Sequence, residues 1–367
     1  MMGFDRRLVE HFDWILFCLT VGLLGLGLLG LYSATYDGSP QASPQFIRQL
    51  IWAAVGLCGM GLAFAIDYRR LEQWAYLLYG AALGLLVLVP LIGSFGGGAR
   101  RWIYVGMFSL QPAEFMKIGL LLVLARWYHR TVPPGGYGIR DILAPAVFFA
   151  APAVLVLWQP NLGTTITLGL LFLTLTFTAG LRLQSLSVLA LAGGSILPFI
   201  WAYLKPYQQQ RVLSFLYPDV DPLGAGYHMI QSQVTVGSGM VWGKGFLLGT
   251  QNRLDFLPEK HTDFVFAVFA EEWGFVGALG LLIVYGILLA RLLVIALRTR
   301  ERFGLLLSVG VAGIIFWQIV INVGMNVGAL PVVGVPLPFL SYGGSSLLTT
   351  MVAIGLALNV STRRLFF

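Results

Sequence analysis

Long apolar runs, separated by short polar segments, make up most of the chain. Each run holds about 20 residues, the length that a helix needs to cross a membrane. The pattern predicts ten spanning helices, near residues 14–34, 47–66, 72–93, 112–128, 141–158, 161–180, 185–204, 263–298, 303–329 and 342–361. The polar segments between them are short, apart from one of about residues 205–262. We therefore predict an all-α polytopic membrane protein, a single domain over residues 1–367. About ten transmembrane helices form its bundle, and a large extracellular loop joins helix 7 to helix 8.

Basic residues gather at one end of the predicted helices and indicate the orientation of the chain. An even number of spans puts both termini on the same side. Excess Lys and Arg in short loops marks the cytoplasmic side of a membrane. That side receives Arg6, Arg7, Arg69, Arg70, Arg126, Arg130, Arg140, Arg182, Arg291, Arg298, Arg300, Arg302, Arg363 and Arg364. Both termini are therefore expected in the cytoplasm and the large loop outside, whereas an odd number of spans would reverse the side of the loop.

Composition agrees with a membrane protein and excludes other classes. Hydrophobic residues make up 57% of the 367 residues and charged residues 11%, with a mean hydropathy of +0.81. A soluble domain with one core cannot bury so many long apolar runs. The net charge of +7 comes without a basic patch interleaved with aromatic residues, so nucleic-acid binding is not expected. Cys18 and Cys58 lie inside apolar runs and the histidines lack close ligand spacing, which argues against a disulfide framework and a histidine zinc site.

The segment 252–263 concentrates charge just before an apolar run that begins at Phe264. It holds three acids and three bases, although charged residues are scarce elsewhere. We therefore expect it at the outer membrane surface, where its side chains Asp255, His261 and Asp263 are candidates for a site. Thr262 or Asp263 is also predicted to cap the helix that follows.

Two arginines are expected at the same outer face. Arg101 follows a glycine run at 96–98, and such a loop lets backbone and guanidinium groups approach a phosphate. An arginine meeting lipid headgroups explains the same pattern equally well. Arg48 opens the second span, where it is either a membrane anchor, the default interpretation, or a phosphate contact.

Glu114 and Lys117 lie near the start of the fourth span. Glu114 in the first turn favours the positive end of the helix dipole, which accounts for it structurally. Lys117, three residues on, shares a face with Glu114 but lies deeper in the membrane. Their ion pair either locks the helix or lends charge to a cavity, and we favour the cavity.

Glu271 and Glu272 are a second pair of ionisable residues within a span. Asp263, Ala267 and Glu271 recur every four residues and share a helix face, which puts Glu271 about two turns into the membrane. Carboxylates at that depth are costly and indicate function, unless they bond to a neighbouring helix or lie at headgroup level.

The last two spans carry polar residues of a different kind. Gln318, Asn322 and Asn326 form a stripe that is expected to hold helices together. Ser341, Gly343 and Gly344 fall where the last helix begins, after a proline-rich stretch. Free backbone N–H groups there form an anion site or a capped helix start.

Four segments together resemble the SEDS family of bacterial cell-wall synthesis. They are Leu254–Phe264, Ala270–Gly274, Gln111–Glu114 and Pro338–Gly344. The resemblance extends over essentially the whole chain and favours the elongation-type branch, RodA, over the division-type branch, FtsW. One position departs from the pattern, because Asn161 stands where many relatives have Asp. An essential carboxylate is therefore not expected there.

The resemblance implies a ten-helix glycosyltransferase of the bacterial cytoplasmic membrane. Such an enzyme polymerises lipid II into glycan strands on the outer face during cell elongation. It implies as partner a class B penicillin-binding protein, a transpeptidase, bound through membrane helices. In this family the acid matching Asp255 is the catalytic candidate. The candidates for substrate binding are Arg48, Arg101, Glu114, Lys117, His261, Asp263, Glu271, Ser341, Gly343 and Gly344.

The reaction itself sets requirements on the site. Joining a sugar hydroxyl to a lipid pyrophosphate donor needs a base for the hydroxyl and positive charge for the leaving pyrophosphate. The hypothesis from sequence makes Asp255 the base, which requires that desolvation raise its pKa. Lys117, Arg48, Arg101 or a divalent cation, Mg or Mn, would neutralise the pyrophosphate. No organic cofactor is expected.

Two other functions fit the same residues. In a lipid II flippase, the Glu114–Lys117 pair, Glu271 and the Gln318 stripe would line a path for the headgroup, and Asp255 would act as a gate. In a noncatalytic scaffold for a wall-synthesis enzyme, the charged loop would be a docking surface. Glycan chains made by purified protein in detergent would argue against the flippase, whereas a scaffold predicts that small changes at Asp255 break a complex before they affect any reaction.

Overall fold

The predicted spans correspond to the long helices of the computed structural model, which describes residues 12–363 apart from 37, 39–40, 97–98, 107, 134, 205, 218–224 and 254–258. Over these residues, ten helices are 19 residues or longer. They are α2 (Trp14–Ala34), α3 (Pro44–Ala65), α4 (Tyr68–Ile92), α5 (Pro112–Arg130), α6 (Ile139–Trp158), α7 (Leu162–Gly180), α8 (Leu183–Tyr203), α12 (Val265–Arg298), α13 (Arg302–Asn326) and α14 (Gly344–Arg363). The all-helical prediction is confirmed.

Eight of these helices are long and apolar enough to cross a membrane, and the chain is a multi-pass membrane protein. The charged helix α5 is not among the eight. It lies inside the bundle, packed against α4, α7 and α13, and most of its side chains are buried. A helix enclosed by other helices can carry Glu114 and Lys117 without exposing them to lipid.

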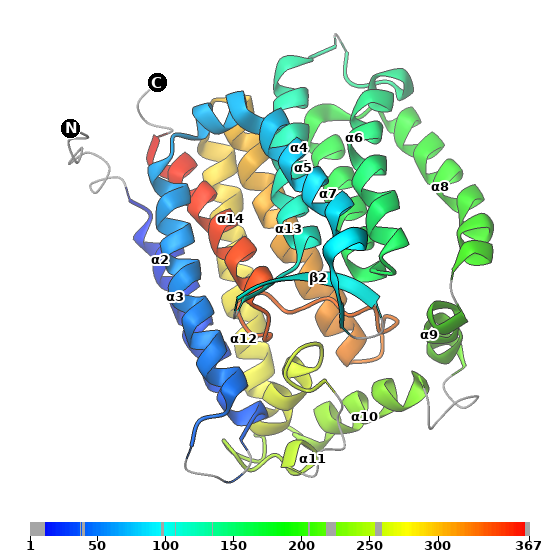
Figure 1. The fold of residues 1–367 in the computed structure, drawn as a ribbon. Coiled ribbons are helices and arrows are strands. Elements are labelled where there is room, and N and C mark those ends of the chain that lie inside the picture. Colours follow the sequence, from blue (N-terminus) through cyan, green and yellow to red (C-terminus); the bar gives the residue numbers. More distant parts are fainter. Residues whose placement is uncertain are drawn as a thin grey trace.

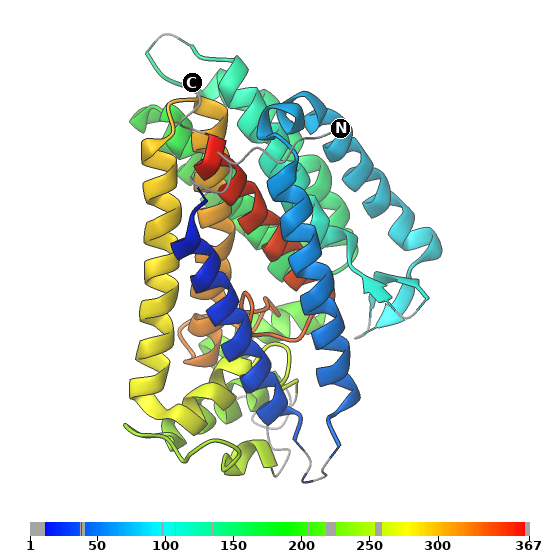
Figure 2. The ribbon, with the colours of Figure 1, turned by 90° about the vertical axis from the view of Figure 1, so that its left-hand side faces the viewer.

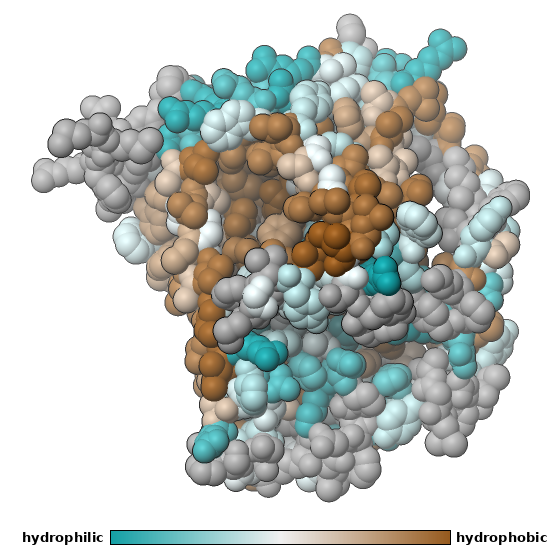
Figure 3. All heavy atoms as spheres, in the orientation of Figure 1, coloured by the Kyte–Doolittle hydropathy of each residue, from teal (hydrophilic) through white to brown (hydrophobic). Residues whose placement is uncertain are grey.

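The bundle has two polar ends. The start of α2 and the end of α14 lie at one end, which we call the terminal face (Figures 1 and 2). The opposite end, the loop face, carries α9 (Pro206–Leu216), α10 (Ala225–Ser238) and α11 (Thr250–Arg253). Figure 3 shows apolar side chains over the bundle between hydrophilic residues at these two ends. Three short helices therefore occur in the segment that the sequence predicted only as a large loop.

A small antiparallel sheet, which the sequence analysis missed, joins α4 to α5. Its strands β1 (Ser94–Gly96), β2 (Ala99–Val105) and β3 (Phe108–Leu110) are ordered β1-β2-β3. Strands of three to seven residues are too short to show a clear two-residue period.

Helix α12 is broken at Gly274. A continuous helix of its 34 residues would be about 51 Å long, well beyond the ~30 Å hydrocarbon layer. Gly274 has φ 66° and ψ −169°, a conformation open mainly to glycine. The part before the break, Val265–Trp273, packs inside the protein and is buried up to Glu272. Only the part after it has the length of a single span, which corrects the predicted span of residues 263–298.

The segment 239–245 supplies the hydrogen bonds that the broken helix lacks. The N–H groups of Phe275 and Val276 donate to the carbonyls of Met240 and Val241 (2.8 and 3.1 Å). Those of Lys244 and Gly245 donate to the carbonyls of Glu271 and Glu272 (both 3.0 Å).

The glycines of this segment permit the close approach of the two backbones. A Cβ on Gly239 would lie 2.1 Å from the Ala270 carbonyl oxygen, and one on Gly243 would lie 2.1 Å from that of Glu272. Larger residues would separate the two backbones and open the bridge across the break.

Candidate functional site

Four segments meet at the loop face around Asp263. They are β2 with Arg101, α9 with Arg211, the turn 259–264, and the loop 331–343 between α13 and α14. Nη1 of Arg211 donates to the carbonyl of Val332 (3.3 Å), which joins α9 to the loop. A Cβ on Gly334 would lie 3.2 Å from Oδ2 of Asp263, so the carboxylate lies against this loop. The acid is therefore enclosed by segments far apart in the sequence.

The backbone around Asp263 is held by α13. The side-chain amides of Asn322 and Asn326 both donate to the carbonyl of Asp263 (3.0 and 3.1 Å). Asn322 also donates to the carbonyl of Val335 (2.8 Å). Asn322 and Asn326 thus tie α13 to the turn and to the loop, whereas the stripe was expected to hold helices together.

Asp263 does not cap α12, and neither does Thr262. The N-cap residue is Phe264, which makes no side-chain capping bond. The predicted cap is wrong because the turn has its own bonds, in which the N–H groups of Thr262 and Asp263 donate to the Glu259 carbonyl (3.1 and 3.2 Å). The carboxylate of Asp263 is left free of the helix and available to the site.

The surroundings of Asp263 make it a stronger base than a free aspartate. Burial, followed by the negative charge of Glu259, raises its pKa from 3.8 to about 6, although part of its surface stays exposed. The positive charges of Arg211 and Arg101 act in the opposite direction. The carboxyl is therefore ionised at neutral pH and lies within the field of two arginines.

Arg101 is fixed by the protein rather than left to lipid headgroups. Its Nε donates to the carbonyl of Gln159 (3.0 Å) and its Nη2 to the carbonyl of Pro160. Gln159 is itself anchored through a hydrogen bond from Nε2 to the carbonyl of Leu86 (2.9 Å). These bonds set the position of the guanidinium relative to Asp263.

Two histidines near this turn favour their neutral form. Burial chiefly lowers the pKa of His261 and of His228, while Glu259 raises both. The backbone at His261 also joins the turn to the last loop, because the N–H of Tyr342 donates to its carbonyl (2.9 Å). His261, two residues before Asp263 in the chain, is therefore a neutral imidazole at physiological pH.

The predicted ion pair of α5 is present. Nζ of Lys117 lies 2.7 Å from Oε2 of Glu114, and both side chains are buried. The start of α5 is joined to α14 by the N–H of Gln111, which donates to Oγ of Ser345 (2.9 Å). The pair is thus enclosed where α5 meets α14.

Glu271 holds the segment that bridges the break in α12. Its Oε1 accepts hydrogen bonds from Nζ of Lys244 (2.7 Å) and from the N–H of Gln251 (3.0 Å). Ser33 of α2 donates to the neighbouring Glu272. Both acids are buried inside the protein, and their bonds give them a structural account. A substrate role for Glu271 stays a prediction.

The start of α14 uses the backbone groups that were expected to bind an anion. The N–H of Gly343 donates to Oε1 of Gln49 (3.2 Å), and Oγ of Ser341 accepts the N–H of Leu337 (2.8 Å). Gly344 is required for packing, since a Cβ there would lie 2.0 Å from the ring of Trp52. These bonds favour the alternative of a closed helix start, while substrate contacts at these residues stay a prediction.

The structure does not connect Arg48 to this site and does not describe Asp255. Asp255 lies outside the described residues, in 254–258. Arg48 is exposed on α3, and no hydrogen bond or ion pair connects it to the described residues around Asp263.

Asn161 caps α7, because its Oδ1 accepts the N–H of Thr164 (3.3 Å).

The sequence analysis gave no role to Arg211 or Glu259. Arg211 is one of several polar residues on a short helix, and Glu259 is one of several charges in its segment. Their effect on Asp263 depends on how α9 and the turn are placed in space. Spacing along the chain gives no signal for that placement.

The only group of three metal-ligand side chains among the described residues lies elsewhere. Glu72, His129 and Glu301 meet at the terminal face. Arg130 pairs with Glu72 (2.7 Å) and Arg69 with Glu301 (3.2 Å), so both acids have cationic partners already. The described part of the loop face offers no comparable set for a divalent cation.

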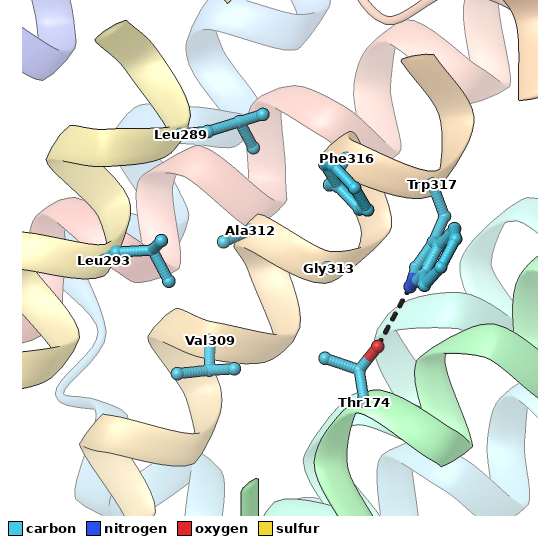
Figure 4. A pocket seen from close by; sticks show the side chains of 8 residues that line it. All are labelled: Thr174, Leu289, Leu293, Val309, Ala312, Gly313, Phe316 and Trp317. Atoms are coloured by element: carbon cyan, nitrogen blue, oxygen red, sulfur yellow. Dashed lines mark hydrogen bonds between the residues drawn. The ribbon is translucent and has the colours of Figure 1, made fainter. Parts of the chain in front are cut away.

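An apolar groove opens on the side of the bundle between α7, α12 and α13. Figure 4 shows Trp317, whose Nε1 donates to Oγ1 of Thr174 (2.9 Å), at one side of it. The groove has a volume of about 270 Å³. It is lined by Thr174, Leu289, Leu293, Val309, Ala312, Gly313, Phe316 and Trp317.

Known proteins match this chain over nearly its full length. The family described as cell cycle proteins, FtsW/RodA/SpoVE, matches residues 14–365. The chain is 41% identical over 355 residues to the peptidoglycan glycosyltransferase MrdB of Escherichia coli K12, covering 96% of this chain and 94% of MrdB. The chain belongs to the SEDS family of peptidoglycan glycosyltransferases.

Other members of the SEDS family match this chain in sequence and in fold. Stage V sporulation protein E of Bacillus subtilis is 38% identical over 360 residues, covering 95% of this chain and 96% of that protein. The structure of Thermus thermophilus RodA matches with a TM-score of 0.72 at 34% identity, covering 96% of this chain and 98% of that chain.

A second SEDS structure was solved within an assembly. It comes from work on the coordination of polymerization and crosslinking by a peptidoglycan synthase complex. The match has a TM-score of 0.83 at 37% identity and covers 96% of this chain and 98% of that one.

Proposed function

We propose that this SEDS protein polymerises lipid II into glycan strands on the outer face of the bacterial cytoplasmic membrane, in the elongation of the cell. The observation that carries the proposal is Asp263, a carboxyl with a pKa of about 6 in the field of Arg211 and Arg101. Among the relatives, MrdB and the RodA of Treponema pallidum are peptidoglycan glycosyltransferases by name, which supports the same reaction.

The orientation follows from charge. The ends of helices at the terminal face carry many of the arginines, and excess Arg in short loops favours the cytoplasm. The terminal face, with residue 12 and Arg363, is therefore assigned to the cytoplasm and the loop face to the outside. Asp263 then lies where lipid II presents its headgroup.

Asp263 is the proposed general base. It takes the proton from the acceptor hydroxyl as the oxygen attacks the anomeric carbon of the donor sugar. The bond from that carbon to the pyrophosphate breaks, and the configuration inverts. A base with a pKa near the working pH combines correct ionisation with proton affinity, which a free aspartate near pKa 4 does less well.

Arg101 and Arg211 are the proposed partners of the leaving pyrophosphate. Both guanidinium groups act on Asp263 electrostatically, so both bring positive charge near the proposed base. Planar guanidinium groups bind phosphate oxygens well. A divalent cation, Mg or Mn, stays a prediction from sequence as a further partner of the pyrophosphate.

A polymerisation assay separates the two candidate bases. Asp263→Asn and Asp255→Asn proteins, purified in detergent with lipid II, are compared with wild type. We expect the polymerisation rate of Asp263→Asn to be about 10² to 10⁴ times lower than that of wild type, as is usual when a general base is removed. Activity of Asp263→Asn within about tenfold of wild type, with a large loss in Asp255→Asn, would return the role to Asp255. Glycan formed without a bilayer also argues against a flippase.

The groove of Figure 4 is the proposed binding site of the partner, a membrane helix of a class B penicillin-binding protein. Its lining is apolar and it faces the side of the bundle, where a membrane helix would meet it. The matching structure from a peptidoglycan synthase complex supports an assembly of this kind.

A further inference from the structure

Three helices enclose polar side chains that lack hydrogen-bond partners among the described residues. Gln318 on α13 is fully buried, and neither its Nε2 nor its Oε1 is bonded. Thr349 on α14 is 2% exposed, and its Oγ1 is unbonded. Oε2 of Glu114 lies close to Lys117 but also accepts no hydrogen bond of acceptable geometry. Few buried polar groups in proteins are left in this state.

The contacts between α5 and α14 place Glu114 and Thr349 at one depth. The N–H of Gln111 donates to Oγ of Ser345, which fixes the level of the two helix starts. Glu114 is three residues further along α5 and Thr349 four residues further along α14. At 1.5 Å per residue they lie about 4.5 and 6 Å beyond this contact.

A contact between α5 and α13 brings Gln318 to the same level. A Cβ on Gly310 would lie 2.1 Å from Cδ1 of Leu121, which fixes the level of these two helices. Gln318 is eight residues beyond Gly310, and Glu114 is seven residues before Leu121. Since α13 runs opposite to α5, these steps move about 12 and 10.5 Å in the same direction. The unbonded groups of α5, α13 and α14 therefore lie at about the same level of the bundle, where these three helices pack against one another.

Gln318 differs from the other members of its stripe. Asn322 and Asn326 use their side-chain amides to hold the turn at Asp263, whereas Gln318, one turn deeper, has no hydrogen-bond partner in the described part of the chain. Exchanging the two ends of the amide does not help, because both ends are unbonded. The missing partner must supply acceptors for Nε2 and donors for Oε1.

We propose that Gln318, Thr349 and the Glu114–Lys117 pair enclose a hydration site, in which one or more water molecules bridge the three helices. Water both donates and accepts, as the set of unbonded atoms requires. A metal ion would leave the N–H donors of Gln318 unbonded, and Lys117 already balances the charge of Glu114. The bridging water fixes the orientation of the Glu114 carboxylate, so Gln318 and Thr349 are positioning residues for the ion pair.

The sign of a stability change distinguishes a hydrated site from a dry one. Full-length Gln318→Met and Thr349→Val proteins are melted in lipid nanodiscs. If water bridges these residues, each substitution removes a hydrogen bond to the water and leaves the other groups around it unsatisfied. The Tm then falls by about 2–4 °C. If the site is dry, each substitution removes a desolvated polar group, and the Tm stays the same or rises. That result would overturn the proposal.

Matched variants keep the test independent of general packing damage. Thr350→Val removes a buried hydroxyl on the same helix that bonds only to the Ser346 carbonyl of its own helix (2.8 Å), and a smaller change is expected. Thr349→Ser keeps the hydroxyl and is expected to melt close to wild type. If the Tm falls as much in Thr349→Ser as in Thr349→Val, the effect comes from packing, and this result would contradict the water bridge.

A double-mutant cycle tests whether the two residues share the water. No direct hydrogen bond joins Gln318 to Thr349, so coupling between them must pass through a bridging group. The double variant is expected to lose less Tm than the sum of the two single losses, because the same water is lost only once. Additive losses would show that the residues do not share it.

Discussion

The side-chain amide of Asn322 donates a hydrogen bond of 3.0 Å to the backbone carbonyl of Asp263. A residue inside the bundle thereby holds the backbone of the proposed catalytic acid, and it holds the loop beside that acid through the carbonyl of Val335 (2.8 Å). The position of the carboxylate at the loop face is thus set from within the membrane domain.

Replacing Asn322 should loosen this arrangement. Asn322→Leu leaves the Val335 carbonyl without this donor and the Asp263 carbonyl with Asn326 alone, which is expected to cost about 1–3 kcal/mol of unfolding free energy. We expect a lower Tm and a polymerisation rate per folded molecule about tenfold below wild type, a loss typical of a misplaced catalytic group. Ser308→Ala is the control, because this buried hydroxyl bonds only within α13, to the Gly304 carbonyl (3.0 Å). Equal losses in both variants would contradict a specific role for Asn322.

The pH dependence of the reaction should report Asp263. The base is active only when ionised, so the rate should rise with pH through about 6 and level off above it. Arg211 lowers the pKa of Asp263, so Arg211→Gln should raise that pKa and move the rise to higher pH, by roughly half a unit. The measurement is the rate of glycan formation against pH.

Arg48→Gln is the matched control for this shift. Arg48 is exposed on α3 and is not among the charges that act on Asp263. Its removal should leave the pH of the rise unchanged. If Arg211→Gln does not move the rise of the pH–rate profile, a group other than Asp263 controls the rate.

The same pKa predicts a conflict between stability and activity. The pKa of Asp263 is about 6 in the folded protein against an ordinary value of 3.8. The folded state therefore prefers the protonated acid, and this stabilisation is full below pH 4 and is lost as pH rises through about 6. At pH 7.5 the charged form costs about 1–3 kcal/mol, since part of the side chain is exposed to water.

Asp263→Asn should therefore be more stable than wild type at pH 7.5 and inactive. The gain in Tm should shrink as the pH is lowered towards 4.5, where wild-type Asp263 also becomes neutral. Melting curves at several pH values measure the difference. A gain that does not change with pH would exclude desolvation of this carboxyl as its cause.

The helices of this fold could be predicted from the sequence, but the arrangement of the site could not. Apolar length determines where a helix lies in a membrane, and α2 has the predicted bounds. The break at Gly274 escaped because a single glycine within an apolar run does not reveal its φ angle. For the same reason the buried segment before the break, which carries Glu271, was predicted as part of one continuous span.

The sequence pointed to the segment that holds the proposed base, but not to Asp263 as that base. Charge density identified 252–263, because ionisable residues are rare in this chain. Which acid of the segment is the stronger base depends on the burial of Asp263 and on Arg101 and Arg211, which come from β2 and α9. Such contacts between distant segments leave no pattern in spacing.

The bridge across the break in α12 should tolerate no side chain at Gly239. Its Cβ would lie 2.1 Å from the Ala270 carbonyl oxygen, so Gly239→Ala must push the 239–245 segment away from α12. We expect a loss of about 1–3 kcal/mol or more, seen as a lower yield and Tm. Gly237→Ala is the control, since nothing lies within 4 Å of a Cβ there. A normal Tm for Gly239→Ala would mean that the segment is not held against the break.

The groove between α7, α12 and α13 should lose its proposed partner when it is filled. Leu293 lines the groove and is 46% exposed, so Leu293→Trp occupies the space that a partner helix would need. We expect copurification with a class B penicillin-binding protein to fall at least tenfold, about 1.4 kcal/mol of binding free energy. Ile287→Trp makes the same change on α12 at a residue that is 48% exposed and does not line the groove. Because both variants add one indole to a lipid-facing helix, equal losses of the partner would indicate a general effect on α12. Loss in Leu293→Trp alone would identify the groove as the contact.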